Sequence, residues 1–434
     1  MRPTSRLLKL AGLCTVLSVF AVALSEAYLI WIGAGLLFFI VITLDVFSLP
    51  KTSAFTVERQ LPARFALGVA STVCLILRHQ ARRSLSLNLH DGLPPDALTE
   101  QLPCVCTIPP GQRVEVAYDL HFTQRGPHSF ELAHLLVDSK WGLWRRLCRA
   151  GEAGETRVYP NYEPIVRFAL LAVANREEQM GIAKRRRSGA TLDFHQLREY
   201  HDGDVLARVD WKATSRRQTL ISRDYEEQRN QSILLVPDCG RRMRAMDGEL
   251  SQFDHCLNAM LLISYIALRQ GDEVGVVGFG GVQRWLKPVK GPPAMPKLLN
   301  HLYDYETTTE PSDFGEAAER VMACQKRRAL VILLTNLRTE DSRDLISAVQ
   351  VMQKRHLVLV ATLKEAEIEA RTNVPVRSQQ DALVYGALSN YLQQRQVLLG
   401  NLNARRIFTL DETAEGLPVA LANKYLDIKA SGKI

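Results

Sequence analysis

The sequence lacks the short motifs that identify the commonest catalytic sites. It contains no Gly-x-Ser-x-Gly nucleophile elbow, no His-Glu-x-x-His zinc helix and no Walker loop ending in Lys-Ser/Thr. Cysteine is too sparse for a disulfide scaffold, with 8 in 434 residues and no Cys-x-x-Cys pair. Cys104 and Cys106 form one Cys-x-Cys, which has no further His or Cys at metal-ligand spacing. We therefore expect a protein that is not an enzyme and that carries no cofactor.

Extremes of composition are absent as well. Hydrophobic residues make up 47% and charged residues 23%, which excludes a disordered or low-complexity chain. The mean hydropathy of −0.07 is too low for a many-span transporter, so the apolar excess must be local. The formal net charge of +8 permits an anionic partner but does not require one. At this length, two or three domains are expected.

Two long apolar runs occupy residues 1–50. One extends from Leu10 to Ser25 and the other from Ala27 to Leu44, with Glu26 between them. A membrane-spanning helix needs about 20 apolar residues. Basic residues precede the first run and follow the second, and such flanks favour the cytoplasm. The pattern predicts a two-helix transmembrane hairpin, which would anchor the chain in the bacterial inner membrane with its bulk in the cytoplasm.

The same N-terminus allows a second interpretation, a cleaved signal peptide. Arg2, Arg6 and Lys9 would form its basic region, and Ala21-Val22-Ala23 resembles a cleavage site. The second apolar run would still cross the membrane in that case.

Short alternating segments fill residues 51–160. Ser84–Leu89 and Arg113–Leu120 alternate polar and apolar residues, as half-buried strands do. Turn-forming residues separate such segments, for example at Asp91-Gly92 and Pro109-Pro110-Gly111. This region therefore predicts a small antiparallel, β-sandwich-like domain, in which no catalytic cluster stands out.

Continuous apolar runs and helical periodicity alternate through residues 231–434. The runs, which buried parallel strands require, are Ile233–Val236, Val274–Phe279, Leu330–Leu334 and Leu357–Val360. Between them, apolar residues repeat at helical spacing, first at Leu257, Met260, Leu261 and Leu268, and later at Leu345, Ile346, Val349 and Met352. The alternation predicts a doubly wound α/β domain, whose ligands would bind beyond the carboxyl ends of the strands.

The densest charge cluster, Lys184-Arg185-Arg186-Arg187, lies in a segment (residues 161–230) that mixes both signs. From Ile182 to Arg229 there are eleven basic and eight acidic residues. A nucleic-acid groove would be more one-sided, so binding of nucleic acid through Arg185–Arg187 is an alternative and not the expectation. Adjacent cations cannot be buried without unpaired charges. We expect a solvated surface that contacts a protein partner, formed by Arg185, Arg186, Arg187, Arg198 and Lys212.

Trp211 and Tyr200 lie among these charged residues, directly before the first strand of the α/β domain. Aromatic residues in such a setting either pack the segment onto the sheet or belong to a docking surface. Because Val209-Asp210-Trp211 leads into the strand region, we expect Trp211 to be structural.

An ordered pattern of residues runs through the same segment. It consists of Arg187-Ser188-Gly189, Phe194, Leu197–Tyr200, Gly203-Asp204 and Val209–Arg216. The pattern resembles the signature of the bacterial domain-of-unknown-function family 58. The resemblance implies a von Willebrand factor A-like C-terminal domain and a MoxR-type AAA+ ATPase, or a client of that ATPase, as the partner. The expected function is that of a membrane-anchored interaction, scaffold or chaperone-adaptor protein.

The resemblance also indicates where a metal would bind in such a domain. The family-wide pattern is Asp-x-Ser-x-Ser after the first strand, with a Thr and an Asp from later loops. Here Asp238 is retained, but Gly240 and Arg242 replace the two serines, and Asn336 replaces the later Asp. The Thr position lies somewhere in the loop Thr307–Ser312.

Lost oxygen ligands and an added positive charge both weaken Mg²⁺ binding. We therefore expect no metal, and expect Asp238 to pair with Arg241, Arg242 or a helix N-terminus. A metal-dependent hydrolase that uses Asp238 is the alternative function.

Overall fold

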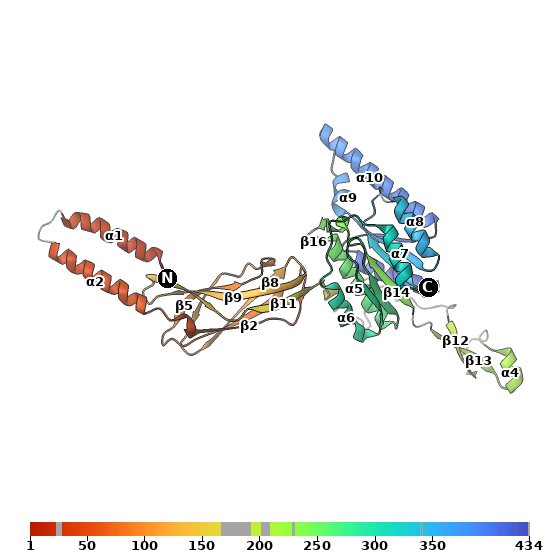
Figure 1. Cartoon of the computed structure of the whole chain (residues 1–434), viewed down its shortest axis with the longest axis horizontal. Coiled ribbons are helices and arrows are strands. Elements are labelled where there is room, and N and C mark those ends of the chain that lie inside the picture. Colours follow the sequence, from red (N-terminus) through yellow and green to blue (C-terminus); the bar gives the residue numbers. More distant parts are fainter. Residues whose placement is uncertain are drawn as a thin grey trace. The chain divides into compact units, whose positions relative to one another are not determined.

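The computed structural model describes residues 1–22, 28–165, 192–200, 209–227, 231–338, 340 and 342–432. The chain divides into two compact units, Met1–Tyr159 and Pro160–Ile434 (Figure 1). Among the described residues, the first unit contains two α-helices and two β-sheets. The second contains a six-stranded sheet with its helices, and two separate two-stranded sheets.

The first unit begins with strand β1 (Arg2–Pro3) and helices α1 (Ser5–Val22) and α2 (Tyr28–Phe47), which lie side by side (Figure 1). In the part of the chain that the structure describes, neither helix is long and apolar enough to cross a membrane. Arg6 and Lys9 fall inside α1, and Asp45 falls in the last turn of α2. This finding overturns the predicted transmembrane hairpin and, with it, the predicted anchoring in the inner membrane.

Asp45 fastens the end of α2 to the turn between strands β9 (Gly126–Asp138) and β10 (Trp144–Ala150). Its fully buried carboxylate accepts hydrogen bonds from the N–H groups of Trp141 (3.0 Å) and Leu143 (3.2 Å), and from the hydroxyl of Ser139. A buried carboxylate is stable only with such donors. The last turn of α2 is therefore part of the folded β-rich body.

Two sheets form the rest of the first unit. The four-stranded antiparallel sheet has the order β2 (Phe55–Gln60), β4 (Ser71–His79), β8 (Arg113–Phe122) and β6 (Ala97–Leu98). The seven-stranded sheet joins β1, β10, β9, β11 (Gly154–Tyr159), β3 (Phe65–Ala66), β5 (Leu85–Gly92) and β7 (Cys104–Ile108). Strands β5 and β8 confirm the two alternating segments. Because β11 and β3 pair in parallel, the larger sheet is mixed and not antiparallel as predicted.

A buried polar cluster connects the two sheets of this unit. Arg59 on β2 donates through Nε (3.0 Å) and Nη2 (2.5 Å) to the carboxylate of Asp91 on β5, and the hydroxyl of Tyr118 on β8 donates to the same carboxylate at 2.6 Å. Asp91 is fully buried, so these donors offset the cost of taking its charge out of water.

The second unit is built on a six-stranded sheet. Its order is β18 (Trp285–Lys290), β17 (Glu273–Val277), β14 (Ser232–Pro237), β19 (Leu330–Thr335), β20 (Leu357–Lys364) and β21 (Phe408–Thr413). Only β18 runs antiparallel to its neighbour among these described strands, so the sheet is mixed. The four predicted apolar runs form its central strands, and the order is that of a doubly wound fold.

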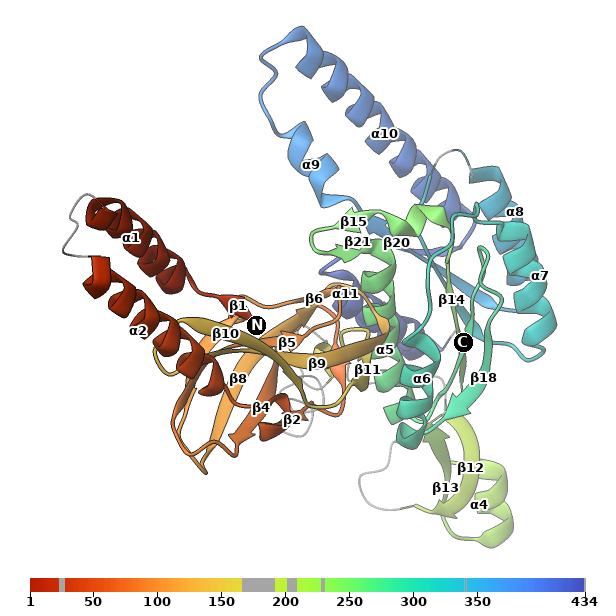
Figure 2. The same ribbon diagram turned by 60° about the vertical axis from the view of Figure 1, so that its left-hand side comes forward.

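Helices cover both faces of this sheet (Figure 2). Helices α5 (Gln252–Arg269), α6 (Met295–Leu302) and α11 (Leu417–Ala430) pack together on one face. Helices α7 (Phe314–Cys324), α8 (Ser342–Gln353) and the base of α10 (Gln379–Ala404) share a core with the other face. The shorter elements are η2 (Thr52–Ala54), η5 (Arg241–Arg244), η6 (Pro292–Ala294), β15 (Met246–Asp247), β16 (Leu250–Ser251) and α9 (Ala366–Thr372).

Helix α10 has an exposed outer half and a buried base. Leu383 and Tyr385 in its outer turns are exposed, whereas Arg395, Leu398 and Leu402 are buried. The guanidinium of Arg395 donates to four acceptors. They are the backbone oxygens of Leu337 (3.0 Å) and Leu363 (2.7 Å), the hydroxyl of Thr362 (2.8 Å) and the carboxylate of Asp411 (2.6 Å). This side chain ties the base of the helix to β20, to β21 and to the segment that follows β19.

The C-terminal end of α10 is a Schellman motif that contains an arginine where glycine is usual. The N–H of Ile407 bonds to the carbonyl of Leu402 (3.2 Å), and the N–H of Arg406 bonds to that of Asn403 (3.0 Å). Arg406 has a φ of 61°, in the left-handed region that costs a residue with a Cβ roughly 1–2 kcal/mol.

Candidate functional site

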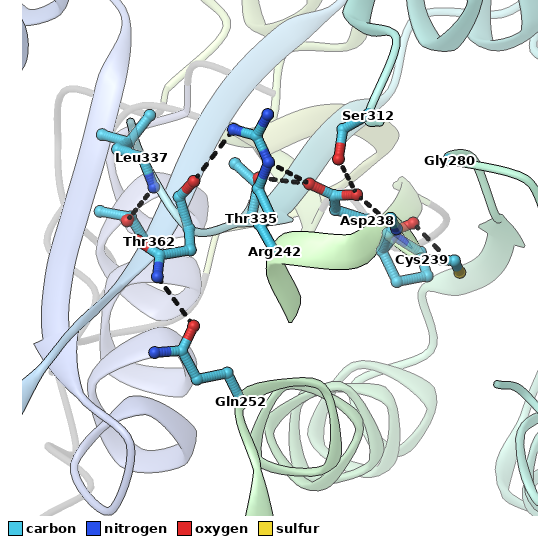
Figure 3. A network of polar contacts seen from close by, with 12 residues as sticks. Asp238, Cys239, Arg242, Gln252, Gly280, Ser312, Thr335, Leu337 and Thr362 are labelled. Carbon is cyan, nitrogen blue, oxygen red and sulfur yellow. Dashed lines mark hydrogen bonds and ion pairs between the residues drawn. The ribbon is translucent and has the colours of Figure 1, made fainter. Parts of the chain in front are cut away.

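The candidate site lies at the carboxyl edge of the six-stranded sheet, where β14 ends at Asp238. The Asp238 carboxylate is fully buried. Figure 3 shows hydroxyl groups from two other segments converging on it: Ser312 donates to Oδ1 and Thr335 to Oδ2, each at 2.6 Å. The N–H of Gly240 donates to Oδ1 at 2.9 Å. Asp238 is thus the acceptor at the centre of a compact polar network.

Two opposing effects act on the protonation of Asp238. Burial raises the pKa of this carboxyl above its ordinary value. The hydrogen bonds from Ser312, Thr335 and Gly240, and the positive charge of Arg242, lower the pKa and so partly compensate. The network therefore stabilises the carboxylate form in a place where burial alone would favour the neutral acid.

Arg242 supplies the positive charge of the site. Its Nε lies 3.8 Å from Asp238 Oδ2, its Nη1 donates to the backbone oxygen of Asn336 at 3.4 Å, and its guanidinium stacks 5.4 Å from the centre of the Phe314 ring. These contacts keep the guanidinium over the buried carboxylate. Of the partners predicted for Asp238, the structure therefore selects Arg242.

Because Gly240 has no side chain, the hydroxyl of Ser312 can lie beside its Cα; the Cβ of a serine at this position would occupy the same space. A Cβ on Gly240 would lie 2.3 Å from Ser312 Oγ and 3.0 Å from Asp238 Oδ1. Gly280, on the facing turn, has a φ of 80°, and a Cβ there would lie 2.6 Å from the nitrogen of Gly240. Close approach of these backbone segments therefore requires glycine at both positions.

The residues at this edge do not fit a divalent cation. Both oxygens of Asp238 already accept hydrogen bonds, and Arg242 brings a like charge to the position of a metal. Within the described residues, no group of three or more His, Cys, Asp or Glu side chains could hold a metal ion. The space near Gly240 is filled by Ser312 Oγ, so a ligand water would have to displace it.

Asn336, the other predicted site residue, belongs to an adjoining network. Its side-chain nitrogen donates to Gln252 Oε1 (2.8 Å) and to Glu365 Oε1 (2.9 Å), and its oxygen accepts from Arg395 Nη1 (3.3 Å). Arg338 pairs with the same Glu365 oxygen at 2.9 Å. The four residues predicted from the sequence therefore lie together at the carboxyl edge of the sheet: Asp238, Gly240, Arg242 and Asn336.

Three important members of these networks were not predicted from the sequence. Ser312 is the last residue of the loop in which the Thr position was expected, and Thr335 directly precedes Asn336. A hydroxyl at the last position of a buried strand was the signal for Thr335. Arg395 could have been found because it is, with Asp381, one of two charged residues in the sequence of α10.

The described residues of the signature segment include two strands of a β-hairpin and a short helix. Strand β12 (Leu192–Glu199) pairs antiparallel with β13 (Ile221–Glu227), and α4 (Trp211–Arg217) lies between them in sequence. The predicted residues Arg185–Arg187 lie outside the described residues, and so does the side chain of Arg198. Lys212 is exposed in the first turn of α4.

Trp211 differs from its prediction. Its side chain is 66% exposed, so the expectation that it is structural and packs on the sheet is wrong. The helix that carries it is nevertheless well formed, because Asp210 caps the N–H groups of Lys212 (3.1 Å) and Ala213 (3.0 Å). The hydroxyl of Thr214 accepts from the N–H of Ile221 at 3.0 Å, which joins α4 to β13.

A doubly wound α/β unit with a buried Asp–Arg pair and an attached hairpin is the class that this geometry defines. Residues 196–382 match the family described as "Protein of unknown function DUF58". This match confirms the family resemblance that the signature predicted.

A bacterial protein matches a longer part of the chain. The chain is similar to the "Uncharacterized protein YeaD" of Bacillus subtilis (strain 168), with 23% identity over 269 residues that cover 60% of this chain and 62% of the relative. The match thus spans less than two thirds of that relative's length.

Two solved structures are each similar to about a quarter of the chain. A fragment of alpha-2-macroglobulin from Escherichia coli shares 14% identity at a TM-score of 0.21, over 24% of this chain and 16% of that chain. The ASH/PapD-like domain 7 of human CEP192 shares 12% identity at a TM-score of 0.19, over 25% of this chain and 89% of that chain. TM-scores of this size carry no inference about function.

Proposed function

We propose that this chain is a non-enzymatic interaction protein, a scaffold or chaperone adaptor, that docks on a protein partner through the hairpin β12–α4–β13. The observation that carries the proposal is the exposure of Trp211, at 66%, on a helix with several exposed cations. A MoxR-type AAA+ ATPase, or its client, is the partner that the family resemblance suggests.

The chemistry of α4 is that of an interface anchor. Tryptophan and arginine dominate the energetics of protein interfaces, because they combine a large contact area with directed polar groups. Lys212, Arg216 and Arg217 are exposed on the same helix as Trp211. A partner with an apolar pocket rimmed by carboxylates would complement this surface.

Local rigidity supports the same role. The cap by Asp210 and the contact from Thr214 to β13 fix the helix on its hairpin, so little conformational entropy is lost when a partner binds. A rigid element with an exposed aromatic side chain is typical of a preorganised docking site.

The Asp238 site supports a structural role for the von Willebrand factor A-like domain that we propose for the second unit. A general base must reach a substrate proton. Asp238 is fully buried, and Ser312, Thr335 and Gly240 direct their donors at it. The Asp238 carboxylate therefore accepts hydrogen bonds from groups of the domain itself.

Pull-down of a purified MoxR-type ATPase by the full-length chain tests the proposal. We expect Trp211→Ala to weaken capture at least tenfold and to leave the melting temperature nearly unchanged, because the side chain makes few contacts within the fold. Trp285→Ala, which removes a tryptophan that is 39% exposed on β18, is the matched control and should bind as the wild type does. Equal capture by all three proteins would refute docking through α4.

A further inference from the structure

The amino edge of the six-stranded sheet gathers basic residues from three neighbouring strands. Lys326-Arg327-Arg328 precede β19, Lys354-Arg355 precede β20, and Arg405-Arg406 precede β21. The strands are parallel and adjacent, with Leu330 beside Leu357 and Leu359 beside Phe408. Their preceding residues therefore meet at one edge, opposite the edge that carries Asp238. None of the segments 325–329, 353–356 and 403–407 contains an acidic residue.

A pocket of about 800 Å³ opens at this basic edge. Its described lining residues are Arg328, Leu357, Asn403, Arg406, Ile407, Phe408, Thr409, Lys424 and Gly432. Three of them are cations and none is a carboxylate. The volume lies within the range of small-molecule sites, so the pocket suits a compact ligand better than a nucleic-acid strand.

Arg406 combines an unusual backbone conformation with a place in the lining of this pocket. The residue occupies the left-handed position that ends α10, where glycine is the usual choice. An arginine there adopts a backbone conformation that its side chain disfavours, and it lines the pocket together with two other cations. Strained positions of this kind are common at binding sites.

Neutral polar and aromatic groups complete the lining. The hydroxyl of Thr409 donates to Asn403 Oδ1 at 2.8 Å, and the amide of Asn403 adds N–H donors beside the cations. Lys424 Nζ lies 5.9 Å from the centre of the Phe408 ring, on α11 across from β21. Arginine and lysine with such donors are the groups that bind phosphate oxygens.

We propose that this pocket binds a small organic or inorganic polyphosphate, with Arg328, Arg406 and Lys424 contacting the phosphate groups. A chain of phosphates supplies several negative charges in a compact volume, which complements the three cations that line the pocket. The proposal is independent of docking through the hairpin, because it uses none of the residues of α4.

Calorimetric titration of the full-length protein with sodium tripolyphosphate tests the proposal. We expect saturable binding that weakens as salt is raised. Arg406→Gly should weaken the affinity at least tenfold, yet leave the melting temperature equal or higher, because glycine relieves the left-handed backbone. Gln218→Gly is the matched control: Gln218 has a φ of 58° at the end of α4, so this variant relieves the backbone without removing a charge and should bind normally.

Two further variants separate the possible outcomes. Lys424→Gln should also weaken tripolyphosphate at least tenfold, whereas unchanged affinity in both Lys424→Gln and Arg406→Gly would overturn the proposal. If ATP binds more tightly than tripolyphosphate, and Phe408→Leu removes that difference, the ligand of the pocket is a nucleotide. If the two compounds bind with equal affinity, the pocket recognises the phosphate chain alone. Binding to vesicles of anionic lipid without binding to either soluble compound would refute a pocket for small polyphosphates.

Discussion

A serine introduced at residue 240 would test whether the Asp238 site has space for a further oxygen ligand. A Cβ at this position would lie 2.3 Å from Ser312 Oγ, whereas Cβ atoms in proteins essentially never approach a heavy atom within 3.0 Å. Ser312 would have to leave its place against Asp238, or the backbone would have to move. Overpacking of this kind costs about 1–3 kcal/mol, so we expect Gly240→Ser to lower the free energy of unfolding by that amount.

A double-mutant cycle makes this expectation sharper. Ser312→Ala removes a hydrogen bond to a charged group and should cost about 1.5–3 kcal/mol. In the double variant, the new hydroxyl at 240 would occupy the vacated space and donate to Asp238. The double variant should therefore be more stable than the sum of the single effects predicts, by about 1 kcal/mol or more.

Urea unfolding of the four proteins measures this coupling. Gly386→Ser is the matched control, because a Cβ at this exposed position of α10 meets no atom within 4 Å. It should change stability by no more than about 0.5 kcal/mol, in either direction. Additive costs, or a Gly240→Ser protein as stable as the wild type, would show that the space beside Asp238 is not filled as described.

Two further predictions concern buried ionisable groups. Burial and the neighbouring Arg355 hold the pKa of His356 below its ordinary value, so the unfolded chain takes up a proton that the fold excludes, and stability falls as the pH drops below about 6.5. His356→Leu should therefore reduce the pH dependence of the unfolding free energy between pH 7 and pH 5, by at most about 1.4 kcal/mol per pH unit. Urea titrations that give the same slope for the variant and the wild type would contradict this. Asp91→Ala should cost about 3–5 kcal/mol because it leaves Arg59 buried without its carboxylate, whereas Glu100→Ala at an exposed site should cost about 0.5 kcal/mol or less; similar losses would argue against the buried cluster.

The strands of the second unit were the most predictable part of the fold. Ile233–Val236 and Leu330–Leu334 are continuous apolar runs, and a parallel sheet covered by helices buries such runs on both faces, so a local pattern was sufficient. The candidate site residues came from the family resemblance, and the strand pattern agreed with it because Asp238 and Asn336 each come directly after one of these strands. Strand order and the parallel pairing of β11 with β3 depend on contacts distant in sequence, which no local pattern encodes.

Trp211 shows where residue type misleads. A large aromatic side chain is more often buried than exposed, and the prediction followed that preference. Exposure depends on what the rest of the chain leaves uncovered, which is a property of the tertiary structure. Ser312 was missed for a related reason: it lies far from Asp238 in sequence, and only the folded loop brings its hydroxyl to 2.6 Å from the carboxylate.

The two halves of helix α10 lie in different environments: its outer turns are exposed to solvent and its base is buried against the sheet. The outer turns, around Leu383 and Tyr385, are exposed, and helical segments this short are only marginally stable in water without packing. Around Arg395, opening a turn requires breaking the pair with Asp411 and the bonds to β19 and β20. Amide protons of the outer turns should therefore exchange with solvent through local fraying, and those at the base only when the sheet itself opens. Local opening of the outer turns should therefore cost the domain little stability, whereas opening the base requires breaking contacts of the sheet.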